Sequence, residues 1–149
     1  MNISIIGGHK ASPKHKKIAY ELGRLIASQG WVLVSGGREG IMEAACRGAK
    51  SVGGLTIGIL PTLDGRDANR YVDIKIPTGL GYARNILVVR ASRFVVAICG
   101  EYGTLSEIAF AFNDPGRVVI GIDTWDIPGV IKVKTAQAAV RRIKQQSRC

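Results

Sequence analysis

The chain has 149 residues, a mass of 15.9 kDa and a formal charge of +10, from 21 Lys and Arg against 11 Asp and Glu. A chain of this length buries about two-thirds of its unfolded surface, so we expect one domain over residues 1–149. The longest uninterrupted apolar run, residues 94–99, is far shorter than the ~20 residues that a membrane-spanning helix needs, which excludes such a helix.

The N-terminus and the cysteines indicate the compartment. Residues 1–6 have no basic start and lead directly into two glycines, so they indicate a first strand rather than a signal peptide. Cys46, Cys99 and Cys149 are odd in number and widely separated, which argues against a disulfide framework. With only His9 and His15 as imidazole partners, no metal site is expected. We expect a cytoplasmic protein.

The positive charge favours anionic partners without choosing among them. A nucleic-acid surface would interleave aromatic with basic side chains, but the three Phe, four Tyr and two Trp are scattered. Binding of nucleic acid through the basic surface is therefore the least favoured alternative. The basic residues near the C-terminus are interpreted as the solvated face of a helix; they are Arg141, Arg142, Lys144 and Arg148.

Short apolar runs alternate with segments of helical spacing along the whole chain. The runs lie at residues 3–6, 31–34, 55–60, 72–76, 94–98, 118–122 and 130–133, and the helical segments at 13–28, 40–50, 81–91, 104–112 and 135–146. Ser12 is a candidate N-cap of the first helix and Pro13 its first residue. Nearly continuous runs of Val, Ile and Leu are typical of strands buried on both faces. The sequence therefore predicts a doubly wound, Rossmann-like α/β domain, with a mainly parallel sheet of about seven strands and helices on both faces.

Two glycine-rich turns each follow a strand and open a helix. The first contains Ser35, Gly36, Gly37 and Gly40, and the second contains Gly100, Gly103 and Thr104. Glycine allows positive φ and close approach to a ligand, while the amides at the start of a helix attract an anion. The two turns predict a phosphorylated small molecule that is held at both.

The common strand order places the first and fourth strands at the centre of the sheet. In that order Gly7, Gly8, Thr78 and Gly79 lie between the two glycine-rich turns, at the carboxyl edge. The turns after strands two and five would be roughly 14 Å apart, so a ligand that touches both is about as long as a nucleotide. The irregular segment 61–71 is either a loop that folds over this ligand or a surface loop.

Two common nucleotide motifs are absent from the sequence. Residues 7–12 read GGHKAS rather than GxGxxG, and the second strand ends in SGG rather than an acid, which disfavours NAD. No glycine loop ends in Gly-Lys-Ser or Gly-Lys-Thr, which excludes a P-loop.

The motifs GYARN at residues 81–85 and CGEYGTLSE at residues 99–107 resemble those of the lonely guy, or lysine-decarboxylase-like, superfamily. SGG at 35–37 with GIM at 40–42 is similar to the first glycine motif of that family, and GILP at 58–61 to its third strand. The resemblance spans roughly residues 2–122. The short form and the 83–85 signature look most like the branch that includes molybdenum-cofactor carrier proteins.

Characterised members of the superfamily are cytokinin riboside 5′-monophosphate phosphoribohydrolases. The resemblance implies that Arg84 would stabilise charge at the sugar and that Glu107 would assist loss of the base or position water. In the hydrolase branch the second motif reads PGGxGTxxE with an upstream Arg-Lys pair, whereas Cys99, Glu101 and Asn85 replace the proline, the second glycine and the lysine here. Residues 104–107 also read TxxE, a capping box, so a structural role for Glu107 stays open.

We therefore expect a protein that binds a nucleotide or nucleotide-like phosphate ester without turnover, as a carrier or sensor. The ligand contacts would include Arg84 and Asn85, a nucleotide or the molybdenum cofactor could be bound, and no cofactor is required. The alternative is a nucleoside 5′-monophosphate phosphoribohydrolase. Relatives in this superfamily are oligomers, and apolar residues of two helices either form a subunit contact of a homo-oligomer, a dimer or a tetramer, or complete the internal core. These residues are Ile86, Leu87, Val88, Val89, Phe110 and Phe112.

Overall fold

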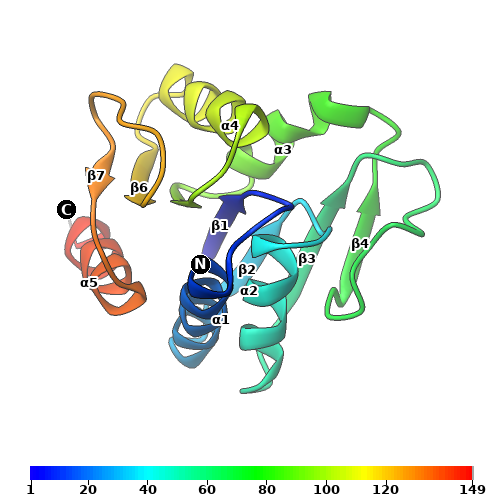
Figure 1. Cartoon of the computed structure of the whole chain (residues 1–149), viewed down its shortest axis with the longest axis horizontal. Helices are drawn as coiled ribbons and strands as arrows, with labels where there is room; N and C mark the ends of the chain where they lie inside the picture. Colours follow the sequence, from blue (N-terminus) through cyan, green and yellow to red (C-terminus); the bar gives the residue numbers. More distant parts are fainter. Residues whose placement is uncertain (149) are drawn as a thin grey trace.

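The computed structural model describes residues 1–148; Cys149, counted above among the cysteines, lies outside the described residues. Figure 1 shows a single twisted sheet with helices on both faces. The strands are β1 (Asn2–Gly7), β2 (Val32–Ser35), β3 (Thr56–Leu60), β4 (Ile74–Pro77), β5 (Phe94–Ile98), β6 (Val118–Ile122) and β7 (Ile131–Lys132). Every pairing among them is parallel, in the order β4-β3-β2-β1-β5-β6-β7. The predicted doubly wound α/β fold is confirmed.

The helices divide between the two faces of the sheet (Figure 1). Helices α1 (Pro13–Ser28), α2 (Ile41–Lys50) and α5 (Ala136–Ser147) cover one face, and α3 (Asn85–Arg90) and α4 (Tyr102–Asn113) cover the other. Successive residues of β5 alternate between the two cores: Phe94 and Val96 pack toward α1 and α2, and Val95 and Ala97 toward α3 and α4. Burial on both faces explains why this strand is apolar throughout.

The predicted position of the fourth strand is wrong. Strand β4 lies at the outer edge beside β3, and β5 takes the central place beside β1. All four β4 residues are exposed, and Ile74, Lys75 and Ile76 alternate apolar and polar, as is typical of an edge strand rather than a central one. The order in which strands are added to the sheet therefore reverses between β1 and β5. The turns after β2 and β5 are two strand spacings apart, roughly 10 Å rather than 14 Å.

Helices α1 and α2 pack closely against each other through two glycines. A Cβ atom at Gly23 would lie 2.0 Å from the Ala45 carbonyl oxygen, and one at Gly48 would lie 1.9 Å from the Tyr20 carbonyl oxygen. At each contact a glycine of one helix therefore lies against a backbone carbonyl of the other. The start of α1 is capped by Ser12, whose hydroxyl accepts a hydrogen bond from the His15 amide at 3.2 Å, as predicted.

Two helix starts differ from the prediction. The segment 81–91 divides into a 3-10 turn, η1 (Gly81–Arg84), and α3, so the regular α-helix begins only at Asn85. Helix α4 begins at Tyr102 after Glu101, which makes no side-chain cap bond. Thr104 therefore lies inside the helix, and the predicted capping box with Glu107 does not form.

Two further features concern the surface. Within residues 1–148, no helix combines the length and the apolar character that crossing a membrane requires. The apolar residues of α3 and α4 divide between inside and outside: Val88 and Val89 are fully buried in the core of this chain, whereas Leu87 and Phe112 are exposed. The exposed pair is available for a subunit contact, and the homo-oligomer stays a prediction.

Candidate functional site

A cavity of about 680 Å³ opens at the carboxyl edge of the sheet, where the strand order reverses between β1 and β5. Open parallel sheets bind ligands at such reversal points, and this volume lies within the ordinary range for small-molecule sites. Its walls come from β1 and the loop after it, the first glycine-rich turn, η1, the start of α3 and the first half of α4. Predicted site residues that line it are Gly7, Gly8, Gly36, Arg84, Asn85, Gly103, Thr104 and Glu107.

Arg84 supplies a buried positive charge to this cavity. Arg84 is only 8% exposed. Its Nη2 donates a hydrogen bond to the Gly36 carbonyl at 3.4 Å, and its Nη1 donates one to the Asn85 side-chain oxygen. Its buried Nε has no hydrogen-bond partner among the described residues. Burial lowers the pKa of Arg84, but a guanidinium remains charged in proteins. An unpartnered buried donor on a cation is an expensive arrangement without a ligand, because desolvation of the charge is uncompensated.

Glu107 lies beside Arg84 in the cavity wall and is 6% exposed. Burial raises the pKa of Glu107 to about 8, and the positive charge of Arg84 opposes that rise only in part. Most Glu107 side chains are therefore protonated near pH 7. In its protonated form the carboxyl leaves the positive charge of Arg84 uncompensated.

The start of α4 faces the same space. Gly103 and Thr104 lie in its first turn, where backbone amides have no partner within the helix and where the helix dipole is positive. Gly100 has a φ of +108°, and a Cβ atom there would lie 2.1 Å from the Thr104 hydroxyl oxygen. Gly100 does not itself line the cavity; its lack of a side chain lets Thr104 occupy its place.

The first glycine-rich turn contributes Gly36 to the cavity and uses its other predicted residues for support. The Ser35 hydroxyl accepts from the Gly37 amide at 3.1 Å, and Ser35 is fully buried. Gly40 has a φ of +69°, and a Cβ atom there would lie 2.4 Å from the Gly8 carbonyl oxygen. Gly40 thereby lets the loop after β1 lie against the start of α2. Ser35, Gly37 and Gly40 lie behind the cavity wall rather than in it.

Thr78 and Gly79 do not line the cavity, because they follow the edge strand β4 rather than a central strand. The Thr78 hydroxyl donates to the Leu60 carbonyl at 2.7 Å, and the Gly79 amide to the Thr62 carbonyl at 3.0 Å. Both bonds fasten this turn to the end of β3.

The loop at residues 61–71 is attached to the first glycine-rich turn. Asn69 is buried and donates from its side chain to the carbonyls of Gly37, at 3.2 Å, and Arg38, at 2.8 Å. Asp67 lies 3.4 Å from Nε of Arg38, which itself lines the cavity. The loop therefore holds Arg38 at the edge of the site, and its residues are not part of the cavity wall.

Several lining residues were not among the predicted ligand contacts: His9, Arg38, Met42, Tyr82, Tyr102 and Ser106. His9 and Tyr102 stand directly beside the predicted residues Gly8 and Gly103, so their place in the sequence was the one signal that could have found them. Met42 could not be predicted, because an apolar residue of a helix has the same sequence pattern whether it faces a cavity or the core. The described residues contain no group of three or more His, Cys, Asp or Glu that could hold a metal ion.

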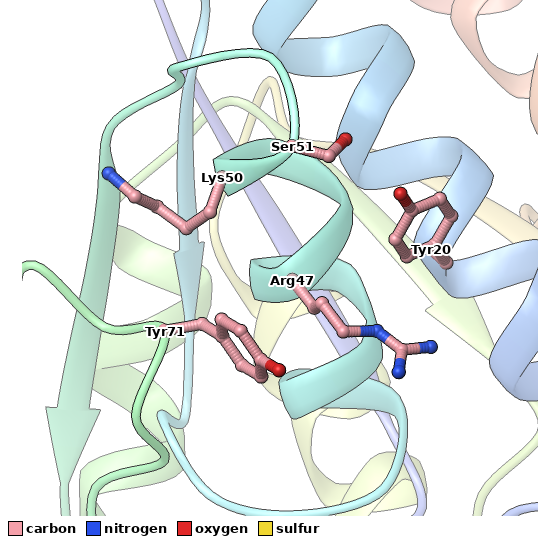
Figure 2. Close-up of a pocket in the computed structure, with 5 residues that line it drawn as sticks. All are labelled: Tyr20, Arg47, Lys50, Ser51 and Tyr71. Carbon is pink, nitrogen blue, oxygen red and sulfur yellow. The ribbon is translucent and has the colours of Figure 1, made fainter.

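A second hollow, of about 540 Å³, lies on the surface of α1 and α2 (Figure 2). Tyr20, Arg47, Lys50, Ser51 and Tyr71 line it. Its cations already have partners: the Arg47 guanidinium lies 5.2 Å from the centre of the Tyr20 ring, and Lys50 forms an ion pair with Asp73 at 2.8 Å. It therefore lacks the buried, unpartnered donor that marks the cavity around Arg84.

Fold and site together define a Rossmann-like α/β protein with a cationic cavity at the reversal point of its sheet. The profile of the SLOG cluster4 family matches residues 1–148, and the chain belongs to this family. The predicted resemblance to the lysine-decarboxylase-like superfamily is thereby confirmed.

Solved structures of two proteins resemble this chain over nearly its whole length. The molybdenum cofactor binding protein of Rippkaea orientalis is 41% identical with a TM-score of 0.90, over 97% of this chain and 95% of that one. The molybdenum cofactor carrier protein of Chlamydomonas reinhardtii is 34% identical with a TM-score of 0.90, over 99% of each chain.

The cytokinin riboside 5′-monophosphate phosphoribohydrolase of Mycobacterium tuberculosis is similar in sequence. It is 32% identical over 77% of this chain and 67% of its own length.

Proposed function

We propose that this protein binds a phosphate ester of nucleotide size in the cavity between β1 and β5, as a carrier or sensor. The molybdenum cofactor is the favoured ligand, because two structural relatives of almost full coverage are named for binding or carrying it. The cofactor would be cargo on this protein.

One observation carries the proposal: Arg84 is buried, charged and left with an unpartnered Nε beside a carboxyl that is mostly protonated near pH 7. A phosphate group supplies both the negative charge and the acceptor oxygens that this arrangement lacks, and Arg binds phosphate with strong charge-assisted hydrogen bonds. An apolar or cationic ligand would leave the guanidinium uncompensated.

The neighbouring backbone suits the same group. The first turn of α4, with Gly103 and Thr104, and the backbone of Gly36 line the same cavity, and at Gly36 no side chain obstructs a ligand. A Cβ atom at Gly36 would lie 2.6 Å from Nη2 of Arg84, so a larger residue would displace the guanidinium. Arg84, Gly36, Gly103 and Thr104 are the proposed phosphate contacts, with Asn85 orienting Arg84.

The residues present are compatible with the molybdenum cofactor, which is a pterin phosphate that holds its metal through sulfur atoms of its own. The phosphate would bind at Arg84 and the start of α4, and the cavity of about 680 Å³ exceeds what a free phosphate ion needs. Arg38 offers a second cation at the edge of the cavity.

A phosphoribohydrolase is the second candidate, favoured by Glu107 and by the mycobacterial relative of that activity. A protonated, buried carboxyl beside an arginine is a suitable general acid. Glu107 would give its proton to the departing nitrogen of the base as the C1′–N bond breaks. Water would then add its oxygen to C1′, releasing free base and ribose 5-phosphate and returning a proton to Glu107.

The two candidates separate in one assay. The purified protein is incubated with AMP and other nucleoside monophosphates, and chromatography measures free base and ribose 5-phosphate, with Glu107→Gln as the control. The carrier proposal predicts that the wild type releases no more free base and ribose 5-phosphate than the variant does. It also predicts that a parallel binding measurement finds the intact nucleoside monophosphate bound. Robust release that disappears in Glu107→Gln would replace the carrier by the hydrolase.

A further inference from the structure

We infer that Tyr82 and Tyr102 form an aromatic rim at the mouth of the cavity, which stacks against the flat nitrogen heterocycle of the bound phosphate ester. The ligand class is then a heterocyclic phosphate rather than a simple sugar phosphate. This inference rests on the proposed function and names the part of the ligand that the phosphate contacts leave open.

Both rings are unusually exposed for tyrosine. Tyr82 is 87% exposed and Tyr102 is 79% exposed, and both line the cavity. Tyrosine is commonly intermediate in burial, because its ring is apolar and only its hydroxyl needs water. Tyr20 and Tyr71 follow that rule, since both are partly buried around the second hollow (Figure 2). The rim tyrosines instead present apolar ring surface beside the space that Arg84 faces.

Tyr102 is held in place from behind. Its ring lies 6.0 Å from that of Trp125, at an interplanar angle of 33°, and the indole N–H of Trp125 donates to the Glu101 carbonyl at 3.1 Å. The hydroxyl of Thr124 donates to the Cys99 carbonyl at 2.7 Å, which ties the loop after β6 to the second glycine-rich turn. A ring supported in this way loses little conformational freedom when a ligand stacks on it.

Each rim tyrosine shares a short element with a phosphate contact. Tyr82 and Arg84 belong to the four-residue turn η1, and Tyr102 belongs to the first turn of α4 together with Gly103 and Thr104. A phosphate bound at Arg84 and the start of α4 therefore shares the cavity with both rings. The group attached to that phosphate extends from the base of the cavity toward them.

Stacking on a tyrosine requires a flat π-system and accepts many of them, since every planar heterocycle presents such a face. A purine ring and a pterin ring both meet this requirement, whereas ribose does not. The inference therefore predicts that the rings strengthen the binding of heterocyclic phosphates and contribute nothing to ribose 5-phosphate.

Calorimetric titration of the full-length protein tests this with AMP, 6-hydroxymethylpterin phosphate and ribose 5-phosphate as separate probes. The variants are Tyr82→Ala, Tyr102→Ala and the conservative Tyr82→Phe and Tyr102→Phe. Tyr20→Leu is the matched control, because Tyr20 is a tyrosine of the second hollow, outside the cavity. Circular dichroism verifies that each variant is folded.

We expect each alanine substitution to weaken the binding of the heterocyclic phosphate by at least about fivefold relative to wild type. The phenylalanine variants and Tyr20→Leu keep wild-type affinity, and ribose 5-phosphate binds all variants alike. The tighter binding of AMP or of the pterin phosphate identifies the preferred heterocycle as a purine or a pterin. Unchanged affinity for AMP and the pterin phosphate in both alanine variants, or an equal loss for ribose 5-phosphate, overturns the inference and leaves the proposed function intact. A wild type that binds none of the three phosphates overturns both.

Discussion

Glu107 makes the stability of this protein depend on pH in a direction that can be worked out. Burial raises the pKa of Glu107 from the ordinary 4.5 to about 8 in the folded chain. Between these pH values the folded state keeps a proton that the unfolded state releases, so the free energy of unfolding falls as the pH rises. This difference in pKa corresponds to a loss of at most roughly 5 kcal/mol in the free energy of unfolding between pH 4.5 and pH 8.

Glu107→Gln removes this titration and nearly preserves the side-chain volume. We expect the free energy of unfolding of the variant, relative to wild type, to increase by several kcal/mol from pH 5 to pH 9, approaching the limit of about 5 kcal/mol. Urea denaturation at the two pH values measures it. Glu39→Gln, at an exposed glutamate of the first glycine-rich turn, is the control and should follow the wild type. If wild type and Glu107→Gln instead lose stability in parallel, Glu107 is ionised at neutral pH and the cavity does not carry the positive charge inferred here.

Two further predictions concern the scaffold. Gly23→Ala places a Cβ atom 2.0 Å from the Ala45 carbonyl oxygen and should lower the free energy of unfolding by roughly 1–3 kcal/mol. Gly103→Ala is the control, because the nearest neighbour of its Cβ atom would lie at 4.0 Å, and it should cause no such loss. Equal losses of stability in thermal denaturation would contradict the packing described. Ser12→Ala removes the cap of α1 at a cost of about 1 kcal/mol, and a melting temperature equal to that of wild type would show that the cap does not stabilise the helix.

Local patterns in the sequence were sufficient for the fold class. The apolar runs and the helical spacing between them depend only on burial and periodicity, which are local properties. The place of β4 was predicted wrongly, because the sheet order is set by which helix crosses which face. Yet Ile74, Lys75 and Ile76 already carried the alternation of an edge strand, in contrast to the continuous run from Phe94 to Ile98.

The predicted site separates into contacts and supports for a similar reason. Gly36 and Gly40 look alike in sequence, but one faces the cavity and the other accommodates the Gly8 carbonyl. The motif at 104–107 satisfies the pattern of a capping box, yet α4 begins earlier, at Tyr102, so Glu107 is free to lie in the cavity wall. Arg38 comes to the site through a loop whose course depends on tertiary contacts such as those of Asn69.

The central claim is that a phosphate ester binds at Arg84, and calorimetric titration of the wild type and Arg84→Gln with AMP and 6-hydroxymethylpterin phosphate tests it most directly. We predict one binding site per chain in the wild type and at least about tenfold weaker binding in Arg84→Gln, since hydrogen bonds to a charged group contribute about 1.5–3 kcal/mol. Equal affinity in the two proteins, or no binding of either compound by the wild type, would contradict the claim.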